Sequence, residues 1–310
     1  MLRLFFVFTT IVTSLQSWGN DYSFDLIADI KTPNQSAANY GRYLFAISDK
    51  MEYFVLFDLE KKKTLYTLHQ SPYKKKNKNQ IVYHCNQCCF GTQKFEEPDF
   101  FPLLYISQRN ESDSTGAFIT VVRIVAHRNN DQEIDSFAIR VVQKIYFPPM
   151  TDDNCLGLPG AVIDKDMDYI YTYSRNINPH ALNYTGARIS KFKVPKCRIN
   201  GKLIKIINFK ETDIVDSFSC NFNLSGAQGG VLHNGKIYLT QGAPRIEPQK
   251  NFIFLRVIDI AKRKCTKMID MLTNGFCTEP EGCWVYNDSL MILDNKGKMY
   301  CLSGNIYKIN

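Results

Sequence analysis

The chain repeats one strand–turn–strand unit, and this repetition constrains its fold more than any other feature. The clearest copies are residues 228–239 and 281–292, and each opens with a step that contains glycine. In both copies two runs of apolar residues flank a two-residue turn, Asn234-Gly235 or Asn287-Asp288. Turns of this kind need positive φ angles, which Asn, Asp and Gly tolerate, so they are strong hairpin signals. Repeated hairpin units predict a radial or stacked β architecture.

The strand-like segments sort into five groups, namely residues 34–69, 86–147, 159–209, 228–271 and 281 onward. Almost no segment has helical periodicity, which indicates an all-β fold. Units of four strands around a ring describe a β-propeller. The sequence therefore predicts five four-stranded blades. The alternatives are a sixth blade within the long second or third group, and a two-layer β-sandwich, which does not predict the same opening in every unit.

Two segments compete to be the outermost strand of the fifth blade. One is 306–309, at the end of the chain, and the other is 24–30, near its start. The second choice closes the ring with an N-terminal strand. We favour it because ring closure removes exposed sheet edges.

The first twenty residues have the pattern of a secretory signal. Arg3 precedes an apolar run over residues 4–15, and the small residues Ser17 and Gly19 follow it. The run is too short to span a bilayer and no stop-transfer pattern follows, although a membrane anchor is the alternative. We expect residues 1–20 to be removed, and residues 21–310 to form a single propeller domain without a membrane span. The mature protein is then periplasmic or extracellular.

Charge and cysteine content suggest neither a nucleic-acid partner nor a metal centre. The formal net charge is +8, and much of it lies in the lysine runs 61–63 and 74–78. These runs lack the interleaved aromatic residues of a nucleic-acid surface and are typical of solvated turns. Ten cysteines permit disulfides in an exported chain, with the pairing left open. Cys85-x-x-Cys88 has no second pair at zinc-ribbon spacing, so no metal site is predicted.

Alignment of the units on their first turn places one polar position at the start of each inner strand. In chain order these positions are Asn34, Asn86, Pro159, Gln228 and Glu281. Inner strands line the channel of a propeller, so we expect this set to surround one mouth of it, where the polar groups either bind a ligand or bond to one another and to water. Small residues follow in several units and let the backbones approach at the axis, namely Gly160, Gly229, Gly230 and Gly282.

Three side chains at this mouth are candidates for acid–base chemistry. Glu279 and Glu281 lie at alternate positions, and His84 precedes the second inner strand. His84 and Glu281 form the candidate catalytic pair. A divalent cation is compatible with the carboxylates, but no repeated Asp-rich loop requires one. No nucleophile elbow, zinc-protease motif or phosphate-binding glycine loop is present.

Several of these motifs resemble those of a known group of proteins. Residues 84–92, 101–107, 228–238 and 279–282 resemble secreted bacterial β-propeller proteins of unassigned activity. The resemblance extends over most of the mature chain and implies a propeller fold and export, but no reaction. More loosely, Glu279-Pro280-Glu281-Gly282 is similar to the metal-binding strand entry of gluconolactonase-type propellers. The other ligands of that family are not recognisable in this sequence.

Two functional hypotheses follow. The first is a monomeric binding module without enzymatic activity, which binds a glycan or a protein at the mouth formed by Asn34, Asn86, Gln228 and the two glutamates. The second is a hydrolase or lyase acting on a sugar or lactone at the same mouth. An enzyme requires several charged or metal-ligating groups that converge at the axis, whereas a binding module requires only a polar mouth. The fold does not decide between them.

Overall fold

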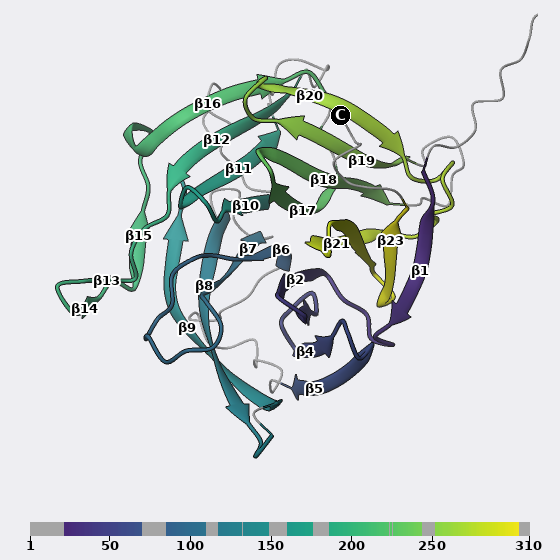
Figure 1. Cartoon of the computed structure of the whole chain (residues 1–310). Coiled ribbons are helices and arrows are strands. Elements are labelled where there is room, and N and C mark those ends of the chain that lie inside the picture. The colour runs from purple at the N-terminus through teal and green to yellow at the C-terminus, as the bar shows by residue number, and fades with distance from the viewer. Residues whose placement is uncertain are drawn as a thin grey trace, which may run out of the picture.

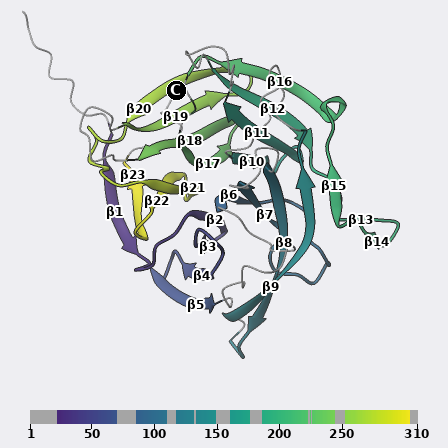
Figure 2. The same cartoon turned by 180° about the vertical axis from the view of Figure 1, so that it is seen from behind.

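Five sheets of antiparallel strands stand around one axis in the computed structural model (Figure 1). The structure describes residues 22–69, 85–109, 117–131, 133–148, 160–175, 186–222, 224, 226–243 and 252–303. This arrangement is the predicted five-bladed β-propeller. The same ring is visible from behind, with the inner strands β2, β6, β10, β17 and β21 closest to its centre (Figure 2).

The blades follow one another along the chain, and each runs outward from the axis. The first contains β2 (Ser36–Tyr40), β3 (Tyr43–Ile47), β4 (Tyr53–Asp58) and β5 (Lys63–His69). The second contains β6 (Cys85–Phe90), β7 (Leu104–Arg109), β8 (Ala117–Arg128) and β9 (Ile134–Tyr146). The third contains β10 (Gly160–Asp164), β11 (Tyr169–Arg175), β12 (Ala187–Lys193) and β16 (Ile214–Cys220).

The last two blades complete the ring. The fourth contains β17 (Ala227–His233), β18 (Lys236–Ala243), β19 (Phe252–Asp259) and β20 (Lys264–Asp270). The fifth contains β21 (Pro280–Tyr286), β22 (Ser289–Asp294), β23 (Lys298–Leu302) and, outermost, β1 (Phe24–Asp29).

The turns between the first two strands of blades four and five have the expected geometry. Asn234 and Gly235 have φ angles of 49° and 70°, and Asn287 and Asp288 have φ angles of 48° and 56°. Two consecutive residues with positive φ characterise the type I′ hairpin turn, whose twist matches that of the flanking strands. The turn chemistry in the sequence therefore fixes where each of these hairpins reverses.

The outer edge of the third blade differs from the prediction. The third group of segments was expected to end at residue 209, but the fourth strand of this blade is β16, which pairs with β12. The end of the expected group contains β15 (Ile206–Asn208), which pairs in parallel with β9 of blade two. Phe209, just after β15, stacks on Phe192 of β12 with ring centroids 4.9 Å apart. This segment therefore adds a fifth strand to the sheet of blade two and contacts blade three through Phe209.

An apolar core lies between each pair of neighbouring blades, so the ring contains five cores. The core between blades one and two is rich in aromatic rings. Phe45 of β3 contacts Phe90, Phe101 and Phe137 edge-on, with centroids 5.0 to 5.7 Å apart. Edge-to-face contacts of this kind add stability beyond the area that they bury. Each blade is therefore held mainly by its two neighbours.

The N-terminal strand closes the ring, as predicted. β1 pairs antiparallel with β23, and Phe24 lies opposite Leu302 at one end of the pair. In Figure 1 the purple β1 lies beside the yellow β23, so the two ends of the described chain meet in one blade. The competing segment, 306–309, lies outside the described residues.

Other expectations about the chain are not tested by the fold. The secretory signal over residues 1–20 lies outside the described residues, as does Cys155. The nine cysteines within the described ranges are all free thiols. In the same ranges no helix has the length and apolar character that a membrane crossing requires.

Ring closure generates a prediction about β1. Phe24 is 7% exposed and packs edge-on against Phe276 with centroids 5.6 Å apart, whereas Leu26 in the same strand is 56% exposed. Replacing Phe24 with Ala should lower the free energy of unfolding by about 3 kcal/mol, because it leaves a cavity between blades four and five. Leu26→Ala should change it by less than about 0.5 kcal/mol. Urea denaturation measures both, and equal effects would contradict this account of closure.

Candidate functional site

Three inner strands carry a β-bulge where they enter the ring. The pairing register shifts between Cys85 and Gln87 in blade two, between Ala227 and Gly230 in blade four, and between Pro280 and Gly282 in blade five. The residues within these bulges include three that the sequence alignment made equivalent, namely Asn86, Gln228 and Glu281. A bulge leaves its extra residue outside the ladder and changes the direction of its side chain. The inner strands of blades one and three pair regularly with their neighbours.

Amide groups and carboxyl groups pair across the mouth where these bulges lie. Gln228 Nε2 of blade four donates to Glu279 Oε1 at 2.6 Å, and Asn295 Nδ2 donates to Glu279 Oε2 at 3.4 Å. Gln35 Nε2 of blade one donates to Glu281 Oε2 at 2.6 Å. These bonds join blades one, four and five across their inner ends. The mouth is therefore a connected polar network.

The two glutamates of this network have different environments. Glu281 is 2% exposed, whereas Glu279 is half-buried. Burial raises the pKa of Glu281 well above its ordinary value, and the nearby charges of Glu279, Asp49 and Asp294 raise it further. Glu281 therefore holds its proton at pH values at which an ordinary carboxyl group has lost it, and Glu279 is the more accessible of the two.

Asn34 and Asn86, the other two polar residues predicted at the mouth, do not bond to the glutamates. Asn34 is buried, and its amide donates to the backbone oxygen of Thr32. Asn86 forms no side-chain hydrogen bond with any described residue. Gln35, next to Asn34, makes the contact to Glu281 instead. Both residues precede β2, and only the Gln35 side chain extends toward blade five. His84 and Pro159 lie outside the described residues.

The inner strands approach one another closely just below this mouth. Gln87 Nε2 donates to the backbone oxygen of Gly230 at 2.6 Å, so the inner strands of blades two and four meet at the axis. A Cβ atom on Gly160 would lie 2.4 Å from the Tyr173 hydroxyl and 2.5 Å from Gln87 Oε1. A Cβ atom on Gly229 would lie 2.8 Å from the backbone of Gly282. The prediction that glycines allow close approach at the axis is confirmed.

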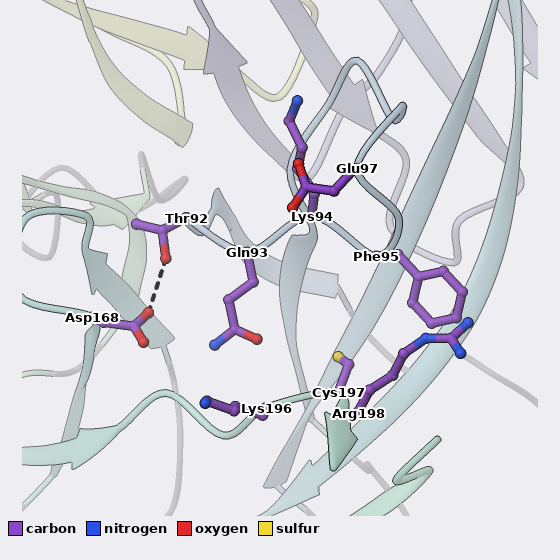
Figure 3. Close-up of a pocket in the computed structure, with 9 residues that line it drawn as sticks. All are labelled: Thr92, Gln93, Lys94, Phe95, Glu97, Asp168, Lys196, Cys197 and Arg198. Atoms are coloured by element: carbon purple, nitrogen blue, oxygen red, sulfur yellow. Dashed lines mark hydrogen bonds between the residues drawn. The ribbon is translucent and has the colours of Figure 1, made fainter. Parts of the chain in front are cut away.

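A cavity of about 520 Å³ lies between blades two and three (Figure 3). It lies at the ends of β6 and β10, whereas the mouth lies where inner strands begin. The loop after β6, the turn between β10 and β11, and the segment after β12 form its walls, with Gln93, Asp168 and Lys196 among the lining residues. Thr92 Oγ1 donates to Asp168 Oδ1 at 2.9 Å across the two blades. No sequence motif predicts this cavity, because three loops that are far apart in the sequence form its walls.

Among the residues that the structure describes, neither the mouth nor the cavity between blades two and three has the ligands of a typical metal site. Within the described part of the chain, no group of three or more His, Cys, Asp or Glu side chains is arranged to hold a metal ion. The carboxyl groups at the mouth are instead bonded to amide donors. Among the described residues, the chemistry available at the mouth is hydrogen bonding and proton exchange at Glu281.

Comparisons with known proteins add little to this picture. No protein-family model and no curated protein matches the chain. Solved structures with distant similarity include a glutaminyl cyclase from Myxococcus xanthus, at 8% identity and a TM-score of 0.48 over 92% of this chain and 97% of that one. A glucose dehydrogenase is similar at 12% identity and a TM-score of 0.46, over 90% and 98% of the two chains.

A third similar structure is the hydrazine synthase of Kuenenia stuttgartiensis, at 12% identity and a TM-score of 0.40. The match covers 84% of this chain but only 61% of that chain. Similarities this distant carry no statement about activity. The resemblance to secreted bacterial propellers and to gluconolactonase-type propellers stays a prediction beyond the shared propeller fold.

The environment of Glu281 predicts how stability depends on pH. Its raised pKa means that the folded protein keeps a proton that the unfolded chain loses above about pH 4.3. The stability contributed by Glu281 therefore falls as pH rises from that value through the folded pKa. Gln at position 281 cannot ionise and still accepts the bond from Gln35. We expect Glu281→Gln to be more stable than the natural protein at pH 8 by at least about 1 kcal/mol.

Urea denaturation between pH 4 and pH 8 tests this prediction. The advantage of Glu281→Gln should vanish near pH 4, where both states of the natural protein are protonated. Glu52→Gln, which changes an exposed carboxyl group, is the control and should show no such trend. A variant at position 281 that loses stability at pH 8 would mean that the folded protein needs an ionised Glu281.

Proposed function

We propose that the protein is an exported binding propeller that recognises a glycan at the mouth formed by Asn86, Gln228, Glu279 and Glu281. The observation that supports this proposal is the set of equivalent bulges, which puts a polar residue at the same level of three inner strands. Bulges concentrate where a protein redirects side chains toward a site. A propeller that needed this mouth only for packing would have no reason to interrupt three ladders at one level.

The balance of donors and acceptors favours a ligand with hydroxyl groups. Glu279 is half-buried and presents carboxylate oxygens, and the Asn86 amide has no partner among the described residues. At the mouth the amides of Gln35, Gln228 and Asn295 donate hydrogen bonds to the two glutamates. A sugar hydroxyl both donates and accepts, so it can bond to carboxyl groups and amides together.

A hydrolase or lyase is the second candidate, and the environment of Glu281 is the observation that favours it. Burial and the neighbouring carboxylates raise the pKa of Glu281, as general acids require at neutral pH. The predicted partner, His84, lies outside the described residues. Release of a new reducing end or an unsaturated sugar from a bound oligosaccharide would identify this activity. Recovery of the intact oligosaccharide after prolonged incubation favours the binding module.

Substitution of Glu279 tests the binding proposal. A glycan array should first identify an oligosaccharide, and calorimetric titration should then measure its affinity. Glu279→Gln keeps an oxygen for Gln228 but removes the accessible charge, so affinity should fall about ten-fold, as for the loss of a charge-assisted hydrogen bond. Glu52→Gln removes an exposed carboxyl group on the same face of the ring and should leave affinity within about two-fold.

Two results would contradict the proposal. An array on which no glycan binds above background would remove glycans as the ligand class. A bound glycan whose affinity is the same for Glu279→Gln and for the natural protein would place recognition away from this mouth.

A further inference from the structure

The cavity between blades two and three (Figure 3) is lined by both polar and apolar groups, and it lies at the ends of β6 and β10, whereas the mouth lies where inner strands begin. Its volume of about 520 Å³ is within the range of about 300 to 1,000 Å³ that is typical of small-molecule sites. Rigid strand ends and a tight turn support its walls, because it follows the ends of β6, β10 and β12. The described chain therefore contains a preformed hollow that the proposed glycan mouth does not use.

The charges that line this cavity favour an anion. Lys94, Lys196 and Arg198 line it together with Glu97 and Asp168. Arg198 lies near the carboxylate of Glu96, with 3.8 Å between Nη2 and Oε1. The ammonium groups of Lys94 and Lys196 form no ion pair within the described residues. Figure 3 shows that Lys94 extends away from the space that Gln93 and Asp168 face, whereas Lys196 faces it and can offer a charge-assisted hydrogen bond to an anionic ligand.

A phenylalanine in the wall offers no platform for stacking. Phe95 is 7% exposed, and its ring is already covered by two guanidinium groups. Arg123 Cζ lies 5.1 Å from the ring centroid, and Arg198 Cζ lies 4.4 Å from it. These contacts hold Arg198 against the wall as cation–π pairs. Recognition in this cavity therefore depends on charge and hydrogen bonds instead of aromatic contact.

Hydrogen-bonding groups beside Lys196 favour a ligand that also carries hydroxyl groups. Figure 3 shows the ends of Gln93, Asp168 and Lys196 facing the same space.

We propose that this cavity binds an anionic sugar, a hydroxylated ring that carries a carboxylate or a phosphate. Lys196, whose end faces the same space as Gln93 and Asp168, contacts the anion. Asp168 and Gln93 bond to ring hydroxyl groups, and Asp168 is held in place by the hydroxyl of Thr92. An anion without hydroxyl groups offers Asp168 no hydrogen-bond donor and places a negative charge close to its carboxylate. A neutral sugar leaves Lys196 without a partner.

Calorimetric titration with five probes tests this proposal on the whole protein. Glucuronate and glucose 6-phosphate carry both features, and they distinguish a carboxylate from a phosphate. Glucose lacks the anion, and acetate and inorganic phosphate lack the ring. We expect at least one sugar anion to bind about ten-fold more tightly than all three simpler probes. Equal affinity for glucose, equal affinity for the simple anions, or no binding of either sugar anion would overturn the proposal.

Variants then locate the site. Lys196→Gln should weaken the sugar anion about ten-fold, because it removes a charge-assisted bond. Lys264→Gln removes an exposed charge from β20 in blade four and should have no effect. Asp168→Asn should weaken the sugar anion and strengthen inorganic phosphate, since it removes both the hydroxyl acceptor and a like charge. The same affinity in Lys196→Gln as in Lys264→Gln would place the ligand elsewhere, and circular dichroism confirms that each variant is folded.

Discussion

The pairing of β1 with β23 is the interaction on which the rest of the structure depends. Each core lies between two neighbouring blades, so five blades in an open row would bury only four cores, whereas a closed ring buries five. The hydrogen bonds between Ser23 and Ser303 extend the pair beyond its last ladder position. Phe24 then adds its ring to the core between blades four and five. A single strand pair thus decides whether the fifth blade is complete and whether its two flanking cores exist.

Closure with only five blades brings the inner strands very close together, and the chemistry of the axis follows from this crowding. At Gly160, Gly229 and Gly282 no side chain fits without displacing a neighbour. Gln87 fills the remaining space and bonds to the backbone of Gly230. The polar residues at the mouth lie above this plug, and Glu281 is buried there with a raised pKa. The carboxyl groups of the mouth lie where inner strands begin, whereas the hollow lined by Lys196 lies beside the ends of β6, β10 and β12.

The fold was predictable because its signals are local. The turns Asn234-Gly235 and Asn287-Asp288 fix hairpins, and Asn86, Gln228 and Glu281, which the alignment of the units made equivalent, each lie within a bulge of an inner strand. The site was less predictable because its details depend on contacts between distant segments. Asn34 and Gln35 both precede β2, and only the Gln35 side chain reaches Glu281 in blade five. The fourth strand of blade three was misplaced because residues 206–208 pair with β9 of blade two. No motif marks the cavity at Lys196, since its three walls are far apart in sequence.

The fifth blade combines a strand from the start of the described chain with three from its end, and this affects the order in which the blades can form during synthesis. Among the described strands, β1 is the first to leave the ribosome and β23 is the last, yet they must lie side by side. Blades one to four can assemble during translation, while β1 has no partner until nearly the whole propeller has been synthesised. The entropic cost of bringing such distant segments together therefore arises in a single step, when β1 pairs with β23. Until that moment β1 has no partner strand among the described residues.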